Sequence, residues 1–273
     1  MPALSKLRDH LRTIATTALP LDVRLWARAQ QRRFGLQAVK VGSVEFGTLR
    51  RLSPISPIFG KDRDLVSVER HYIERFLGEH AGDVRGRTLE MGDPAYTMKF
   101  GGDRVTQADV LHYVAGNPQA TFVADLTDAP GIPDDTFDCI IITQTLQMIY
   151  DVPAAIATLF RILKPGGVVL ATSHGISRVA RREGVDDWGE YWHFTSQSSR
   201  RLFRAHFGDD GVTIRTYGNV LASVASLHGL ASRELDLLEL DFHDPNFELI
   251  IGVRAIKAPR AGPERQPDGN AAR

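Results

Sequence analysis

The stretch from residue 133 to residue 170 limits the fold of this chain more than any other part of the sequence. It holds an apolar run at 137–142, then a segment with apolar residues at helical spacing, and then a second apolar run at 168–170. Asp151 and Pro153 stand where a helix begins, and Gly166-Gly167 stand where it ends. A strand, a helix and a second strand in this order predict a βαβ unit, which joins two parallel strands.

The same alternation of strand-like and helix-like segments continues on both sides of this unit. It predicts an α/β fold, a doubly wound Rossmann-like sheet that is mostly parallel and covered by helices on both faces. Helices are expected at 65–80, 198–206 and 221–240. Strands are expected at 88–91, 105–109, 120–124, 137–143, 168–172, 212–217 and 247–255.

Three regions are expected along the chain. Residues 1–60 are predicted to form a basic helical N-terminal extension, with helices near 3–17 and 21–34 before a segment rich in Gly, Ser and Pro. Residues 61–256 are predicted to form the α/β domain. Residues 257–273 carry charge, Pro, Gly and Ala with almost no apolar content, so this tail is predicted to be disordered.

Residues 88–173 resemble the class I S-adenosylmethionine-dependent methyltransferases, in particular the group that acts on small molecules. The best match is the acid-bearing strand of Pro133 to Ile141, the helix after it and the turn Leu163-Lys164-Pro165-Gly166-Gly167. The resemblance implies the seven-stranded sheet of that family and S-adenosyl-L-methionine as cofactor. It also implies an enzyme that transfers a methyl group to an acceptor.

The glycine-rich cofactor loop of this family is only partly matched. Glu90 and Gly92 match its start, where the resemblance places them in cofactor binding. The next two glycine positions hold Pro94 and Tyr96. Proline has no N–H to offer, and tyrosine fills space that a glycine would leave open.

Further cofactor contacts follow from the resemblance. Asp109 is expected to close its strand 19 residues after Glu90 and to accept hydrogen bonds from the ribose hydroxyls. Asp125 is expected to accept a hydrogen bond from the adenine amino group, with Leu126 lining the adenine slot. Thr143 and Gln144 are expected to face the methionine part of the cofactor.

Methyl transfer to a hydroxyl requires a group that takes the proton. His174 follows the strand at 168–172, and His193 stands among the aromatic residues Trp188, Tyr191, Trp192 and Phe194. Histidine titrates near neutral pH, so these two residues are the candidate general bases, with ordinary loop roles as the alternative for each. The expected acceptor is an oxygen of a small molecule or a saccharide.

Other function classes stay in consideration. Pro94 and Tyr96 leave open a methyltransferase-like binding or regulatory protein without turnover. A nicotinamide-dependent oxidoreductase needs three glycines in one turn, and only Gly92 stands at the required place. No metal site is expected from the spacing of potential ligands. No Asn/Asp-Pro-Pro-Tyr/Phe sequence follows the strand at 137–143, which argues against methylation of adenine bases.

Charge and cysteine content bear on partners and location. The 33 basic and 33 acidic residues cancel, which argues against nucleic acid as a partner. Residues 1–51, however, hold ten Lys/Arg against three acids, so peripheral docking on a membrane or a protein through this segment is an open expectation. The single cysteine, Cys139, fits a reducing cytoplasm, and the N-terminus lacks the unbroken apolar core of a signal peptide.

Overall fold

The computed structural model describes residue 23 and residues 45–63, 66–180 and 189–260. The chain divides into two compact units, residues 1–52 and residues 53–273. The helices expected at 3–17 and 21–34 lie outside the described residues, apart from Val23, which is helical. Residues 53–60, expected in the extension, belong to the second unit, because Ser56 is fully buried there and its N–H donates to the carbonyl of His228.

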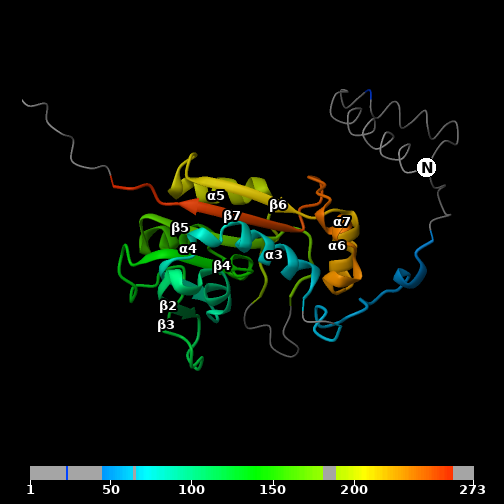
Figure 1. The fold of residues 1–273 in the computed structure, drawn as a ribbon, viewed down its shortest axis with the longest axis horizontal. Coiled ribbons are helices and arrows are strands. Elements are labelled where there is room, and N and C mark those ends of the chain that lie inside the picture. Colours follow the sequence, from blue (N-terminus) through cyan, green and yellow to red (C-terminus); the bar gives the residue numbers. More distant parts are fainter. Residues whose placement is uncertain (1–22, 24–44, 64–65, 181–188, 261–273) are drawn as a thin grey trace, which may run out of the picture. The chain divides into compact units, whose positions relative to one another are not determined.

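The second unit is built on one seven-stranded sheet in the order β3-β2-β1-β4-β5-β7-β6 (Figure 1). All pairs from β3 to β5 are parallel, whereas β7 runs antiparallel to both β5 and β6. The predicted fold class, a doubly wound and mostly parallel sheet, is confirmed. The strands are β1 (Gly86–Met91), β2 (Val105–His112), β3 (Phe122–Val123), β4 (Phe137–Thr143), β5 (Leu163–His174), β6 (Val212–Tyr217) and β7 (Ile250–Ile256).

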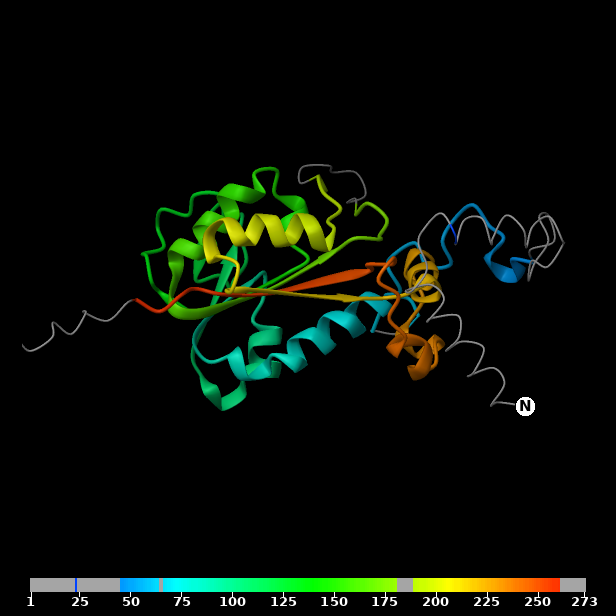
Figure 2. The ribbon, with the colours of Figure 1, turned by 90° about the horizontal axis from the view of Figure 1, so that it is seen from above.

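Helices cover both faces of the sheet. Figure 2 shows α5 (Ser196–Phe207) on one side and α3 (Val68–Glu79) on the other. The apolar side chains of α5 and of α4 (Val152–Ile162) pack into one core cluster, and those of α3 and of α6 (Val220–Leu227) pack into a second. Among the described helices, none is both long enough and apolar enough to cross a membrane.

Local sequence explains where the helices begin. Ser67 accepts a hydrogen bond from the backbone N–H of Arg70, and Asp151 accepts one from Ala154, so each satisfies an otherwise unpaired N–H of the first turn. Thr195 and Ser198 form a reciprocal capping box at the start of α5.

Gly252 fixes how α3 lies on the sheet. A Cβ atom at this position of β7 would come within 2.4 Å of the Phe76 ring, so only glycine leaves room for the ring against the strand. Phe76 is 1% exposed and belongs to the core cluster between α3 and the sheet. The Phe76 ring therefore fits against Gly252, which lies 176 positions later in the sequence.

One prediction about the C-terminal half is wrong. The single helix expected at 221–240 is interrupted, because Gly229 adopts a left-handed conformation with φ of 69° and ends α6, and α7 (Leu237–Asp241) begins only afterwards. Of the expected tail, the structure describes residues 257–260, where the Lys257 amino group donates to Asp135 and to the carbonyls of Phe160 and Leu163. Residues 261–273 lie outside the described residues.

Candidate active site

The strand order places one crevice of the sheet at the carboxyl ends of β1 and β4. From β1 the sheet extends through β2 to β3 on one side, and from β4 it extends through β5 on the other, so the strand order reverses between β1 and β4. The loops after β1 and β4 lead in opposite directions at this point and leave a crevice between them. Glu90 pairs with Ile141, and Thr143 pairs with Thr172 of β5, so the last residues of these strands lie at one edge. Most residues predicted for the site lie on or just after these strand ends.

The loop after β1 is held by Glu90. This carboxylate is buried and accepts the backbone N–H groups of Tyr96 at 3.1 Å and Thr97 at 2.7 Å. Burial raises the pKa of Glu90, against the effect of these hydrogen bonds. Gly92 has φ of 87°, and a Cβ on it would meet no atom within 4 Å, so the space beside its Cα is open. Its N–H donates to the carbonyl of Leu111, and its carbonyl accepts from the Asn117 side chain.

Asp109 does not close its strand. β2 continues to His112, and Asp109 pairs with Leu89 inside the sheet. Its carboxylate is buried and accepts a hydrogen bond from Arg87 Nε at 2.7 Å. The expectation that it stands at the ligand-binding edge is wrong, because a charge partner on β1 holds it three residues before that edge.

Asp125 stands at a small cavity next to the end of β3. The cavity measures about 270 Å³, and its lining includes Phe122, Asp125 and Ile132. Asp125 Oδ1 accepts hydrogen bonds from the backbone and side chain of Thr127, which orients the carboxylate. Leu126 is buried in the adjoining core and does not line this cavity.

The end of β4 carries a strained glutamine. Thr143 is the last residue of the strand, and Gln144 has φ of 48°, a left-handed conformation that costs free energy in a residue with a side chain. Gln144 Oε1 accepts a hydrogen bond from Gln147 Nε2 at 3.0 Å and lies 3.1 Å from His174 Nδ1. The strained backbone thus places an amide oxygen against the ring of His174.

His174, Glu190 and His193 form a cluster beyond the end of β5. His174 Nε2 is in ion-pair contact with Glu190 Oε1, and His193 Nε2 lies 3.8 Å from the same oxygen. The side chains of His174 and Glu190 are 7% and 1% exposed, whereas that of His193 is 37% exposed. Burial lowers the pKa of His174, and the Glu190 carboxylate opposes this shift.

Aromatic side chains lie beside the cluster. Tyr150 contacts Tyr191 edge to face and Trp192 at a tilt, with ring centres 5.4 and 5.9 Å apart. The Trp192 indole N–H donates to the carbonyls of Ile149 and Tyr150, which fixes the ring. These three rings are largely exposed, whereas Phe194 is buried in the core, and Trp188 lies outside the described residues.

Sequence reasoning missed Glu190 and the grouping around it. His174 ends a strand, and Glu190 and His193 lie three residues apart in a later loop, so their spacing predicts no shared site. In the part of the chain that the structure describes, these three are nevertheless a group whose ligand atoms all lie within 4.8 Å of one another. The expectation that no cluster of metal-ligand type exists is therefore wrong.

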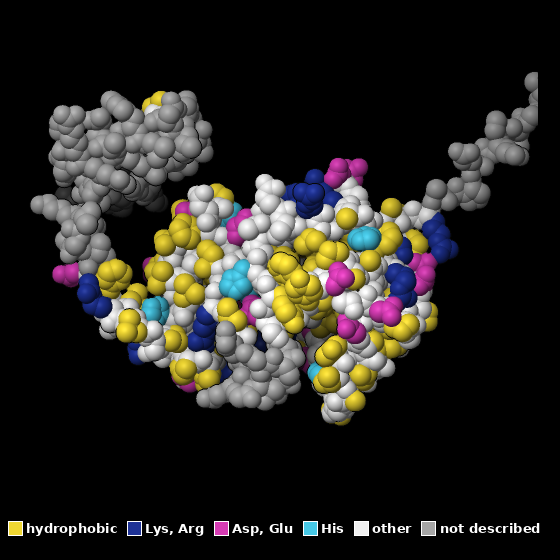
Figure 3. Space-filling view, turned by 180° about the vertical axis from the view of Figure 1, so that it is seen from behind, with side chains coloured by type: hydrophobic (Ala, Val, Ile, Leu, Met, Phe, Trp, Pro, Cys, Tyr) yellow, Lys and Arg dark blue, Asp and Glu magenta, His cyan; other side chains and the backbone are white. Residues whose placement is uncertain are grey.

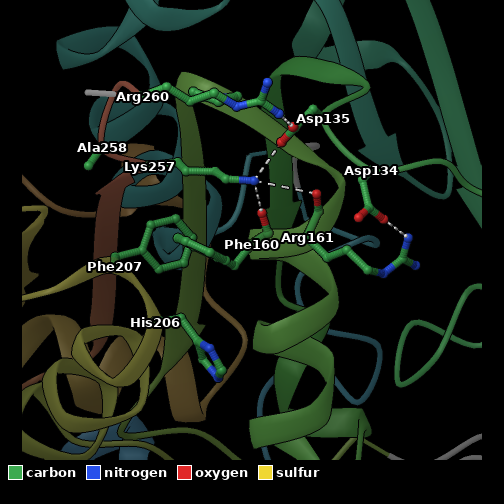
Figure 4. Close-up of a pocket in the computed structure, with 10 residues that line it drawn as sticks. Asp134, Asp135, Phe160, Arg161, His206, Phe207, Lys257, Ala258 and Arg260 are labelled. Atoms are coloured by element: carbon green, nitrogen blue, oxygen red, sulfur yellow. Dashed lines mark hydrogen bonds and ion pairs between the residues drawn. The ribbon is translucent and has the colours of Figure 1, made fainter. Parts of the chain in front are cut away.

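A larger cavity lies away from these strand ends. It measures about 470 Å³ and is lined by residues around Phe160, His206 and Lys257 (Figure 4). It adjoins the start of β4 and of β5, which is the amino edge of the parallel sheet. The Lys257 amino group is engaged by Asp135 and three backbone carbonyls, so its role is to hold the chain after β7.

Residues 62–207, more than half of the chain, match a family described as a methyltransferase domain. The ubiquinone/menaquinone biosynthesis C-methyltransferase UbiE of Escherichia coli O139:H28 is 34% identical over 208 residues, 60% of this chain and 82% of the relative. UbiE of an Enterobacter species is 28% identical with the same coverage. A solved S-adenosylmethionine-dependent methyltransferase of Mesorhizobium loti aligns with a TM-score of 0.43 and 15% identity over 70% of this chain and 98% of that chain.

Proposed function

The chain belongs to the methyltransferase domain family and is an S-adenosylmethionine-dependent methyltransferase, and from this premise we propose that it methylates a hydroxyl oxygen of a small molecule or saccharide. The observation that carries the choice of a hydroxylated acceptor is the cluster of His174, Glu190 and His193 beyond β5. A hydroxyl must lose its proton as it attacks the methyl carbon, and this cluster offers the proton a destination. An amine acceptor with a free lone pair has less need of such a group.

The three members of the cluster have different proposed tasks. His193 is the most exposed, so it is the member that meets the acceptor hydroxyl. Glu190 contacts both imidazoles and stabilises positive charge on either of them. His174 is buried and oriented by Gln144, and it holds Glu190 in place. The sulfonium of the cofactor supplies the methyl group, so the chain mainly positions the acceptor and accepts its proton.

The cofactor is proposed to lie across the carboxyl ends of β1 and β4. Its methionine part occupies the open space beside Gly92 and meets the residues Thr143 and Gln144. Its adenine enters the cavity at Asp125. Glu90 acts through the loop that it holds, since both of its oxygens accept backbone N–H groups. The ribose is proposed to lie beyond His112, at the end of β2, rather than at Asp109.

The two acids predicted for the cofactor are expected to behave differently when replaced. Asp125→Ala removes a hydrogen-bond acceptor from the cavity wall and is expected to weaken binding of S-adenosylhomocysteine by about tenfold or more, as for one hydrogen bond to a charged group. Asp109→Ala leaves the affinity unchanged, because its carboxylate is buried against Arg87. Isothermal titration of the parent and both variants checks this, and equal losses in the two variants would contradict it.

A second candidate acceptor is a ring carbon of a hydroxylated aromatic compound. The observation that favours it is the similarity to the UbiE proteins, which are named as C-methyltransferases. The exposed rings of Tyr150, Tyr191 and Trp192 offer an apolar wall that suits a planar ring or the face of a sugar. Removal of a ring hydroxyl proton would activate such a carbon as well, so the cluster serves either acceptor.

Product analysis separates the two candidates. The full chain is incubated with methyl-labelled S-adenosylmethionine and a panel of saccharides, hydroxylated aromatics and quinols, and the products are examined by mass spectrometry and by NMR of the labelled methyl. A methoxyl carbon signal supports the proposed oxygen transfer. A methyl signal on a ring carbon supports the second candidate. Formation of no labelled product with any acceptor class would speak against turnover on small hydroxylated molecules.

We propose that nucleic acid is not a partner of this chain, that residues 1–51 mediate peripheral docking and that the protein acts in the cytoplasm. In the view of Figure 3, basic side chains of the described residues are interspersed with acidic ones, so this face has no basic patch of the kind that binds nucleic acid. Docking through residues 1–51 concerns a segment described only at Val23 and from residue 45 onward. Salt-dependent retention on anionic liposomes that disappears on deletion of residues 1–51 would support it.

A further inference from the structure

The hydrogen bonds around His174 decide which of its ring nitrogens carries a proton. Gln147 Nε2 donates to Gln144 Oε1, so that oxygen is an acceptor, and His174 Nδ1 lies 3.1 Å from it. Gln147 Nε2, a donor, also lies 3.5 Å from His174 Nδ1, but the contact with Gln144 Oε1 is the shorter one, so we assign the proton of the neutral ring to Nδ1. Its other nitrogen, Nε2, then presents a lone pair to the carboxylate of Glu190.

This arrangement brings two electron-pair acceptors face to face. Among the described residues, His174 Nε2 and Glu190 Oε1 are both buried and neither makes a hydrogen bond with proper geometry, although the two atoms are in contact. The other carboxylate oxygen of Glu190 already accepts the backbone N–H of Ala180. Two facing lone pairs in a buried place are satisfied either by a proton on His174 Nε2 or by a metal ion that both atoms ligate.

We propose that His174, Glu190 and His193 bind a divalent first-row transition metal ion, with zinc as the ion that the donor set suits best. Two imidazole nitrogens and one carboxylate oxygen with an open fourth position form the donor set of catalytic zinc sites. His193 Nε2 completes the set at 3.8 Å from Glu190 Oε1. Its exposed side chain marks the open side, where the fourth ligand enters.

The groups behind the ligands fit a metal site. A metal-bound histidine usually donates its second ring N–H to a carbonyl or carboxylate oxygen, and the carboxylate ligand is usually hydrogen-bonded as well. Gln144 Oε1 accepts from His174, and the backbone N–H of Ala180 donates to Glu190. The proposal also explains the strained backbone of Gln144, which positions the amide oxygen against the His174 ring.

The role of the ion rests on the proposed function, whereas its binding does not. With the ion bound, the imidazole of His193 is a ligand and no longer the base that it is in the metal-free cluster. The ion then takes the acceptor oxygen as its fourth ligand and lowers the pKa of the hydroxyl, and the proton leaves to a solvent water. The oxygen lone pair then forms the bond to the methyl carbon, and the electrons of the breaking carbon–sulfur bond go to sulfur. The products are the methylated acceptor and S-adenosylhomocysteine, and the ion keeps its oxidation state.

Cobalt(II) is the probe for the test, because its visible absorption reports the ligands and the coordination number. The full chain is freed of metal with a chelator, dialysed and titrated with Co²⁺. We expect one Co²⁺ per chain with micromolar or tighter affinity, and displacement of Co²⁺ by Zn²⁺. Glu190→Gln and His193→Ala are each expected to weaken binding at least about tenfold. Gln144→Ala is expected to cost about 10- to 100-fold, as for other groups behind metal ligands.

His206→Ala is the matched control, because this histidine is exposed on α5 and lies at the other edge of the sheet. It is expected to bind Co²⁺ as the parent does. Circular dichroism verifies that each variant is folded. His193→Ala is not expected to affect folding, because this side chain is exposed, so a loss of Co²⁺ binding in this variant reports on the site itself. Absence of stoichiometric Co²⁺ binding by the parent, or equal binding by Glu190→Gln, would overturn the metal site.

Different experimental results would refute the metal site and the proposed function. Full methyl transfer by chelator-treated enzyme without any effect of added Zn²⁺ overturns the metal's role and leaves the hydroxyl acceptor standing. Tight Co²⁺ binding in a chain that binds S-adenosylhomocysteine but methylates no hydroxyl compound overturns the proposed acceptor and leaves the metal site standing.

Discussion

Glu190→Gln is expected to lower kcat for methyl transfer by about 100- to 10,000-fold, the range in which proton-transfer groups contribute. The reason is geometric, since Glu190 contacts both His174 and His193 and is nearly fully buried between them. The amide has the same shape but no charge, so it neither stabilises an imidazolium nor ligates a metal well. Initial rates of S-adenosylhomocysteine formation measure the effect once an acceptor is found.

The affinity for S-adenosylhomocysteine is expected to stay unchanged in Glu190→Gln, because the cluster meets the acceptor rather than the cofactor. Glu79→Gln is the matched control. Glu79 lies at the end of α3, where it pairs with Arg75 and accepts the hydroxyl of Tyr217, so the same chemical change there should leave kcat as it is. A rate for Glu190→Gln within a few-fold of the parent would refute the role given to the cluster.

Phe76→Ala is expected to lower the free energy of unfolding by about 3 to 5 kcal/mol, as for other buried phenylalanines. The ring is 1% exposed and fills the gap that Gly252 leaves on β7. Truncation therefore removes apolar burial and leaves a cavity between α3 and the sheet. Urea denaturation followed by circular dichroism measures the change.

Phe242→Ala is the control for this substitution. Phe242 is 64% exposed, and surface substitutions of this kind usually change stability by less than about 0.5 kcal/mol. Similar losses for the two variants would mean that the fit between Phe76 and Gly252 does not hold α3 on the sheet.

The order of strands and helices could be predicted because its signals are local. The strands at 137–143 and 212–217 have the bounds that their apolar runs indicated, and Asp151 caps α4 as its position before Pro153 suggested. The periodicities of strands (two residues) and helices (3.6 residues) involve side chains only a few positions apart, so they can be recognised directly in the sequence. The prediction of a single helix at 221–240 failed at a local signal as well, since Gly229 adopts a left-handed conformation and ends α6.

The candidate site could be predicted only in part. The position of His174 follows from the length of the strand before it, and the structure places it at the expected edge. Asp109 was misplaced because its distance from the edge depends on the register with β1, where Arg87 faces it. Register is decided by pairing across the sheet, which no spacing along one strand reveals.

The sequence by itself determined the fold class, the βαβ unit at its centre and the histidine at the end of β5, because each depends on short-range periodicity or on turn residues. Only the tertiary structure decided that Glu190 and His193 return to that histidine, that Asp109 lies inside β2 against Arg87 and that Phe76 needs Gly252. These facts are contacts between residues far apart in the chain. They form only when the register of the sheet and the course of the loops are fixed. Side chains that are distant in the sequence then come into contact inside the protein, where the dielectric constant is low.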